Sequence, residues 1–257
     1  MKEKSENRKA LPKFLATLLI AGLGGGVIGF FVGLANVFGL DAAGFAAGVS
    51  RTLQKAVPWG SPVCILLFGG GVLWLYRAAG RKAAAWDGGD ESDASREAED
   101  LLSWTMLLSG MQLLTALFFF AAAVHYQLPH VLYHVAVLFL SCGTVIFAQQ
   151  KAVDLTKRMN PEKRGSVYDK KFQKTWLESC DESERRQIGQ AAYQAFLVTS
   201  RLCLWLWVGL MVLNMVFDFG LMPIAAVLLV LGVMQGTYGL ACIRLGKKGR
   251  LKGAAEN

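Results

Sequence analysis

The feature that most constrains this fold is the alternation of long apolar runs with short, charged polar segments. An apolar run of about 20 residues, folded as a helix, matches the roughly 30 Å thickness of the hydrocarbon core of a bilayer. The runs predict membrane spans at about residues 14–38, 57–76, 101–124, 131–149, 199–217 and 221–243. The expected fold class is therefore all-α: a polytopic bundle of six transmembrane helices, forming a single membrane domain over residues 1–257.

Basic residues are distributed unevenly among the polar segments, and this predicts the orientation of the helices. Of the 27 Lys and Arg residues, 24 lie in the N-terminal segment, the segment 77–100, the loop 151–194 and the C-terminal tail. Since short basic segments stay in the cytoplasm, we expect both termini and the loop 151–194 on that side. The segment 41–55, with only Arg51 and Lys55, is expected to be an outer loop. Orientation also accounts for the net charge of +8 without a nucleic-acid partner.

Glycines in the first apolar run form a regular pattern. Gly22, Gly26, Gly29 and Gly33 recur at spacings of four, three and four, which places them on one smooth helix face for close packing. Gly24, with two of these glycines, also satisfies the dinucleotide-binding pattern G-x-G-x-x-G. That pattern binds a cofactor only where a strand turns into a helix, and no strand is expected here. No cofactor is therefore predicted.

The basic loop 151–194 contains a helix start signal. Asp181 and Glu184 have the spacing of a capping box, in which each side chain accepts a hydrogen bond from a free backbone N–H of the other residue. A helix should therefore begin near Glu182 and continue without a break into the fifth span. In the acidic segment before the third span, Gly88 and Gly89 indicate a turn, and residues 94–100 are expected to begin the next helix.

A short apolar face lies within the same basic loop. Phe172, Trp176 and Leu177, with Lys171 beside them, are predicted to lie on a short amphipathic helix that Asp169 caps. Such a helix lies on anionic lipid head groups or docks on a protein partner, and the lipid surface is the favoured interpretation.

Residues in this loop carry a family resemblance. They are Asn160-Pro161-x-Lys163-Arg164-Gly165, then Tyr168-Asp169-x-Lys171-Phe172-Gln173-x-x-Trp176-Leu177-x-Ser179-Cys180-Asp181-Glu182, and Tyr193. On these residues, the chain resembles a bacterial family of six-span membrane proteins catalogued only as a domain of unknown function. The resemblance extends to the length and hydropathy of nearly the whole chain. It implies a multi-pass protein of a bacterial plasma membrane, of Gram-positive type, and it implies no catalytic residues.

Three histidines are the only candidates for a metal site. His130 and His134 are four residues apart and share a helix face, while His125 lies across the short outer turn. With a carboxylate from Asp41 or Asp218, such a set can bind zinc. Histidines are also ordinary interfacial residues, and no Glu follows His130 as a metalloprotease motif requires. No metal centre is therefore predicted.

Polar side chains at mid-depth bear on transport. Gln112, Ser141 and Gln235 form either a polar path or hydrogen bonds between helices. Since no Asp, Glu, Lys or Arg is expected in mid-span, ion-coupled pumping is disfavoured. Nor does the sequence contain a catalytic constellation, so we do not expect an enzyme.

These observations predict an accessory or regulatory membrane protein that acts through its cytoplasmic loops, in contact with the lipid bilayer and with a membrane or cytoplasmic protein partner. The acidic residues Asp90, Glu91 and Asp93 are expected to dock on the basic loop, in competition with that partner or with lipid. The alternative is a small permease or a subunit of an export complex.

Overall fold

The computed structural model describes residues 12, 15, 16, 19, 26, 30, 42–85, 93–217 and 220–255. The helices are α2 (Ala42–Ala84), α3 (Asp93–His125), α4 (Val131–Met159), α5 (Phe172–Glu178), α6 (Glu182–Phe217) and α7 (Met222–Ala255). All of them except α5 are long and apolar enough to cross a membrane. The all-α prediction is confirmed, as is the start of a helix near Glu182. The first expected span, 14–38, lies mostly outside the described residues, together with Gly22, Gly29 and Gly33.

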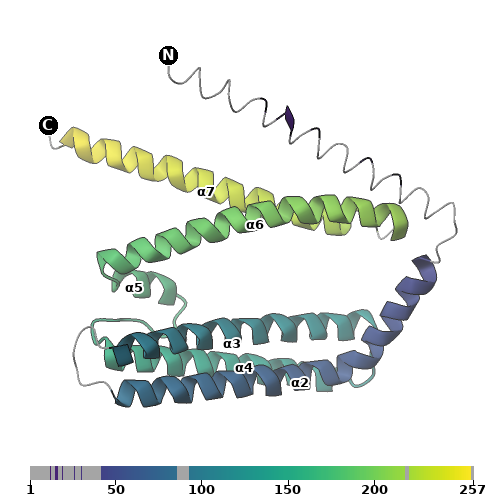
Figure 1. Cartoon of the computed structure of the whole chain (residues 1–257), viewed down its shortest axis with the longest axis horizontal. Helices are drawn as coiled ribbons and strands as arrows, with labels where there is room; N and C mark the ends of the chain where they lie inside the picture. The colour runs from purple at the N-terminus through teal and green to yellow at the C-terminus, as the bar shows by residue number, and fades with distance from the viewer. Residues whose placement is uncertain are drawn as a thin grey trace. The chain divides into compact units, whose positions relative to one another are not determined.

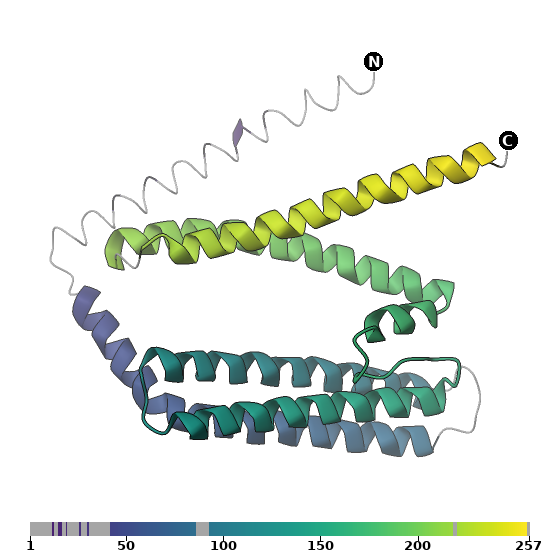
Figure 2. The same ribbon diagram turned by 180° about the vertical axis from the view of Figure 1, so that it is seen from behind.

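The chain divides into two compact units, residues 47–188 and residues 1–46 with 189–257. In the first unit, α2, α3 and α4 lie side by side as a three-helix bundle (Figures 1 and 2). Its buried core includes Ala79 from α2, Leu102 from α3, and Ala152 with Leu155 from α4. The two alanines, Ala79 and Ala152, are the small residues that allow helices to pack closely in a membrane.

Glycines set the distance between α2 and α3. A Cβ atom at Gly60 would overlap the ring of Phe119, and one at Gly71 would lie 2.7 Å from Leu108 Cδ2. Gly70, by contrast, has no heavy atom within 4 Å of its Cβ position, although it lies on the same helix. Two of these glycines are therefore required by packing, and the third is not.

The segment 42–55, predicted as an outer loop, is instead the first part of α2. Its polar residues suggested a loop, but Arg51 and Lys55 are four residues apart and share one helix face. Pro58 and Pro62 lie inside the helix, and Figure 1 shows α2 bending between its first part and the rest. Proline is the usual cause of such a bend because it removes a backbone donor and its ring displaces the preceding turn.

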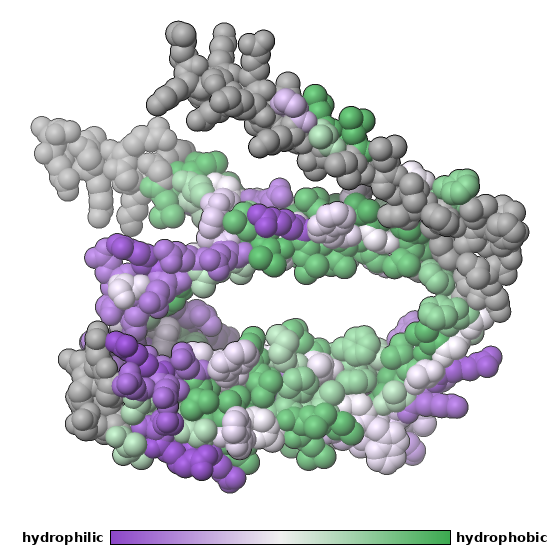
Figure 3. Space-filling view, viewed as in Figure 1, coloured by the Kyte–Doolittle hydropathy of each residue, from purple (hydrophilic) through white to green (hydrophobic). Residues whose placement is uncertain are grey.

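The second unit contains α6 and α7, and Gly220, shortly before α7, has a φ of 79°. The rings of Phe196 and Tyr238 stack across the pair with centroids 4.4 Å apart. Many large side chains face outward, including Trp205 at 74% exposure. Figure 3 shows apolar side chains along the helices of each unit and polar ones towards helix ends, the distribution that a lipid environment requires.

Candidate functional site

Residues 160–188 form a folded structure at the end of α4, which we call the polar cap. It comprises the loop after α4, the short helix α5 and the first turns of α6. The buried amide of Gln150 holds its loop: Oε1 accepts hydrogen bonds from the Val167 N–H at 2.8 Å and from the Ser166 hydroxyl at 3.0 Å. Nε2 of the same amide donates to Asp154 at 2.7 Å. The loop is thus ordered by buried polar contacts.

A second contact joins the loop to α6. The Lys163 side chain is only 3% exposed and forms an ion pair with Glu184, whose side chain is 35% exposed. Glu184 also accepts the Asp181 N–H at 3.0 Å, while its own N–H donates to Asp181 Oδ1 at 2.8 Å. The predicted capping box is therefore present, and one of its members additionally neutralises a buried lysine.

The ionisation of this cluster follows from its partners. Burial disfavours the ammonium of Lys163, but the hydrogen bond and the charge of Glu184 outweigh it and raise the pKa of Lys163 above its usual value. Burial also raises the pKa of the neighbouring Cys180 thiol. The lysine is therefore charged and the thiol protonated at neutral pH.

Helix α5 packs against the loop through aromatic rings. The centroids of Phe172 and Trp176 lie 5.6 Å apart. Gly165 has a φ of 123°, and a Cβ atom there would lie 3.0 Å from the Phe172 ring, so both conformation and space favour glycine.

The two ends of α5 are held differently. The Asp169 carboxylate accepts the Lys171 N–H at 2.9 Å in the turn before the helix, but no side chain caps the helix itself at Lys171, so the predicted Asp169 cap is not formed. At the other end, the Arg185 guanidinium donates to the carbonyls of Leu177 at 3.1 Å and Glu178 at 2.7 Å. A helix of seven residues needs such contacts because it has few backbone hydrogen bonds of its own.

A pocket of about 390 Å³ lies between the polar cap and the adjoining ends of α3 and α4. Phe172 and Trp176 line it from α5, and Lys163 with Glu184 contribute its charged wall. Glu99 from α3 also lines the pocket and accepts a hydrogen bond from the Asn160 side chain at 2.9 Å.

The predicted docking residues differ in their exposure to solvent. Phe172 and Trp176 are half-buried, whereas Lys171 and Leu177 are exposed. Sequence reasoning missed the Lys163–Glu184 pair and the role of Gln150. The capping box located Glu184, but no signal distinguishes Lys163 among the basic residues of the loop.

Part of the acidic segment lies outside the described residues, including Asp90 and Glu91, so its docking on the basic loop stays a prediction. Asp93 is exposed at the start of α3. Glu97, one turn on, pairs with Lys82 on α2. Within the described residues, Glu99 connects this part of α3 to the polar cap through Asn160.

Polar side chains inside the bundle are paired with one another. Gln112 donates to Thr144 Oγ1 at 2.8 Å and to Ser141 Oγ at 3.4 Å, which links α3 to α4. Gln149 donates to Ser109 Oγ at 3.2 Å in the same interface. Gln235 is exposed on α7, in the other unit.

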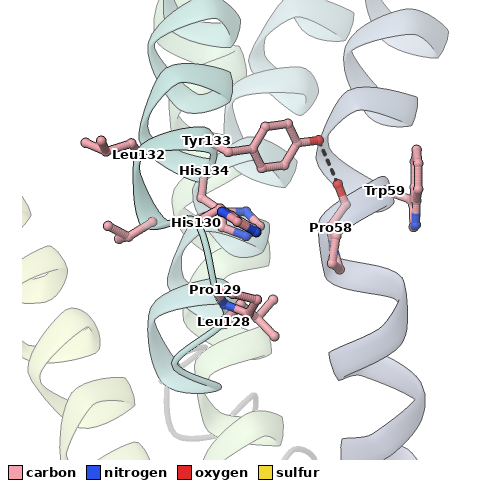
Figure 4. Close-up of a pocket in the computed structure, with 9 residues that line it drawn as sticks. Pro58, Trp59, Leu128, Pro129, His130, Leu132, Tyr133 and His134 are labelled. Atoms are coloured by element: carbon pink, nitrogen blue, oxygen red, sulfur yellow. Dashed lines mark hydrogen bonds between the residues drawn. The ribbon is translucent and has the colours of Figure 1, made fainter.

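An open groove of about 930 Å³ lies at the opposite end of the bundle, between α2 and the turn that joins α3 to α4 (Figure 4). The Tyr133 hydroxyl donates to the Pro58 carbonyl there at 3.0 Å. That carbonyl has lost its helical partner because Pro62, four residues on, has no N–H. The contact with Tyr133 thus replaces the missing helical hydrogen bond.

The histidines lie at this end but do not assemble a metal site in the described structure. His134 is buried, His130 is exposed with a φ of 61°, and His125 packs on the Tyr126 ring with centroids 4.9 Å apart. Among the described residues, no three His, Cys, Asp or Glu side chains are placed to hold a metal ion. Asp41 and Asp218 lie outside those residues.

A family model described as "Protein of unknown function (DUF3169)" matches residues 8–234. No curated protein and no solved structure matches the chain.

Proposed function

Since the chain belongs to the DUF3169 family of proteins of unknown function, we propose a function from its own surfaces: an accessory or regulatory protein of the bacterial plasma membrane that acts through the polar cap. The observation that carries this proposal is the buried Lys163–Glu184 pair beneath an ordered loop. A loop that only connects two spans needs no buried ion pair, and ordered loops on rigid scaffolds are common sites of binding.

The surface that meets the partner is the exposed side of α5. Lys171 and Leu177 are exposed there, and Leu177 is 43% exposed despite its apolar side chain. Phe172 and Trp176 contribute indirectly, because they hold α5 against the loop and line the pocket. The partner is a membrane or cytoplasmic protein, or the lipid head groups beside the cap.

Site-specific photocrosslinking in native membranes tests the contact. A photoreactive amino acid at position 177 should form a discrete crosslinked product with a protein partner. If α5 contacts lipid head groups instead, the products should be lipid adducts. The matched control is position 182, where the side chain is 91% exposed on the adjacent first turn of α6. Equal yields at the two positions, or no product at position 177, would show that α5 is not the docking surface.

The proposed orientation has a separate test. The 24 Lys and Arg residues in the four basic segments support a cytoplasmic location of the polar cap. In a variant without its five native cysteines, Leu177→Cys should react with a membrane-impermeant maleimide only after the cells are permeabilised. Labelling of intact cells would contradict the orientation.

A further inference from the structure

Helix α2 is too long to be a simple membrane span. The candidate membrane-spanning helix within it, Gly44–Ala84, has 41 residues. At about 1.5 Å per residue this length is roughly 62 Å, about twice the hydrocarbon thickness of a bilayer. The 20 residues 57–76 are enough for one crossing. The segment 42–56 therefore extends beyond the hydrocarbon core.

This first segment of α2 is amphipathic. Phe45, Val49 and Leu53 recur every four residues and share one face. Arg51 and Lys55 are also four apart but are offset by two residues, about 200° around the helix, which places them on the opposite face.

Two of these three apolar side chains are exposed in the part of the chain that the structure describes, and Leu53 is half-buried. Phe45 is 68% exposed and Val49 is 43% exposed, although both are large apolar residues. A helix with uncovered apolar side chains on one side and cations on the other is suited to the boundary between acyl chains and head groups.

The bend in α2 lies where this segment meets the membrane span. Pro58 and Pro62 are inside the helix, and the Tyr133 hydroxyl satisfies the carbonyl that Pro62 leaves without a partner. Trp59, between the prolines, is 73% exposed, and tryptophan is enriched at membrane interfaces.

We propose that residues 42–56 form an interfacial helix that lies on the phospholipid surface, and that the two prolines are the elbow through which the chain enters the bilayer. The apolar side of the helix contacts the upper acyl chains, while Arg51 and Lys55 reach the phosphates. The proposal rests on the membrane location of the protein but not on the role of the polar cap.

Spin-label accessibility tests the placement. The full chain, without its native cysteines, would carry one nitroxide-labelled cysteine at position 45, 49, 51 or 55, in vesicles of phosphatidylethanolamine and phosphatidylglycerol. Collision rates with lipid-soluble oxygen and with a water-soluble nickel chelate are then compared. Positions 45 and 49 should favour oxygen, and positions 51 and 55 should favour nickel, with ratios that differ by several-fold.

Each other pattern overturns the interfacial helix. Nickel access at all four positions places the segment in water, and oxygen access at all four places it inside the bilayer. Low access to both reagents at positions 45 and 49 shows that protein covers the apolar face. In a Pro58→Ala/Pro62→Ala variant, oxygen access at positions 45 and 49 should fall as α2 straightens. An unchanged ratio there would refute the elbow, whereas the crosslinking result at position 177 tests the proposed function independently.

Discussion

Replacing Glu184 with Gln should open the polar cap, whereas replacing Lys163 with Met should disturb it much less. Gln at position 184 can still form the capping box, so Glu184→Gln isolates the loss of the ion pair. It leaves a lysine that is 3% exposed without its charged partner. Lys163→Met removes the buried charge instead and leaves a carboxylate that is 35% exposed and still accepts the Asp181 N–H.

The magnitudes follow from burial. Removing one partner of a fully buried ion pair costs about 3–5 kcal/mol. Because about a third of the Glu184 side chain is exposed, solvent screens part of the interaction, and we expect roughly 2–3 kcal/mol for Glu184→Gln. Lys163→Met should cost about 1 kcal/mol or less, since the apolar stem is kept. The first value corresponds to about a 30- to 150-fold increase in the opening equilibrium of the cap.

Hydrogen exchange measured by mass spectrometry is the appropriate assay, because the cap can open locally without unfolding of the bundle. Amides of α5 and the start of α6 should exchange faster in Glu184→Gln, while amides of the α3–α4 interface serve as the internal reference. The double variant should recover most of the protection. Equal effects of the two single variants, or an additive double variant, would refute the reasoning.

The same ion pair sets a pH dependence. Because the folded-state pKa of Lys163 is raised, its contribution to stability is present below its pKa in the unfolded chain and is lost as pH rises through the raised value. The raised pKa of Cys180 acts in the same direction. Protection of the cap, corrected for the intrinsic exchange rate, should therefore fall in the alkaline range. Lys163→Met should remove the part of this loss of protection that comes from the titration of Lys163.

Three further changes test local packing, each by thermal unfolding in detergent. Gly60→Ala should destabilise the bundle by about 1–3 kcal/mol because its methyl group overlaps the Phe119 ring, whereas the matched control Gly70→Ala should not; equal effects would contradict the packing. Gly165→Ala should cost about 2 kcal/mol because φ there is 123°, and a neutral result would contradict the strain. Tyr133→Phe should cost about 0.5–1 kcal/mol by leaving the proline carbonyl without its donor, and unchanged stability would show that this hydrogen bond does not stabilise the bundle.

The helices were predictable because their signals are local. Apolar runs of membrane length identified the long helices, and Asp181 with Glu184 located the start of α6. The helical segment 42–55 was missed because residues of its apolar face and of its basic face alternate along the sequence. Their contributions to the mean hydropathy therefore cancel. Arg51 and Lys55 lowered the apolar content of that segment, although their spacing is that of a helix.

The candidate site was only partly predictable because it is assembled from separate elements. Phe172 and Trp176 were recognised as an apolar pair, but Phe172 packs against Gly165, in a loop whose conformation no periodicity reveals. The partner of Lys163 lies 21 residues along the chain, beyond an intervening helix. The loop 151–194 contains ten basic residues, and no sequence signal distinguishes Lys163 from the others.

That separation has a consequence for the synthesis of the protein. Chains elongate at about 5–20 residues per second, so roughly 1–4 s pass between the addition of Lys163 and that of Glu184, 21 residues later. During this interval the lysine is a solvated cation next to a newly made membrane helix. It can therefore count among the charges that orient that helix during insertion. In the finished protein the same charge is buried and neutralised, so a positive residue that directs assembly need not appear on the mature surface.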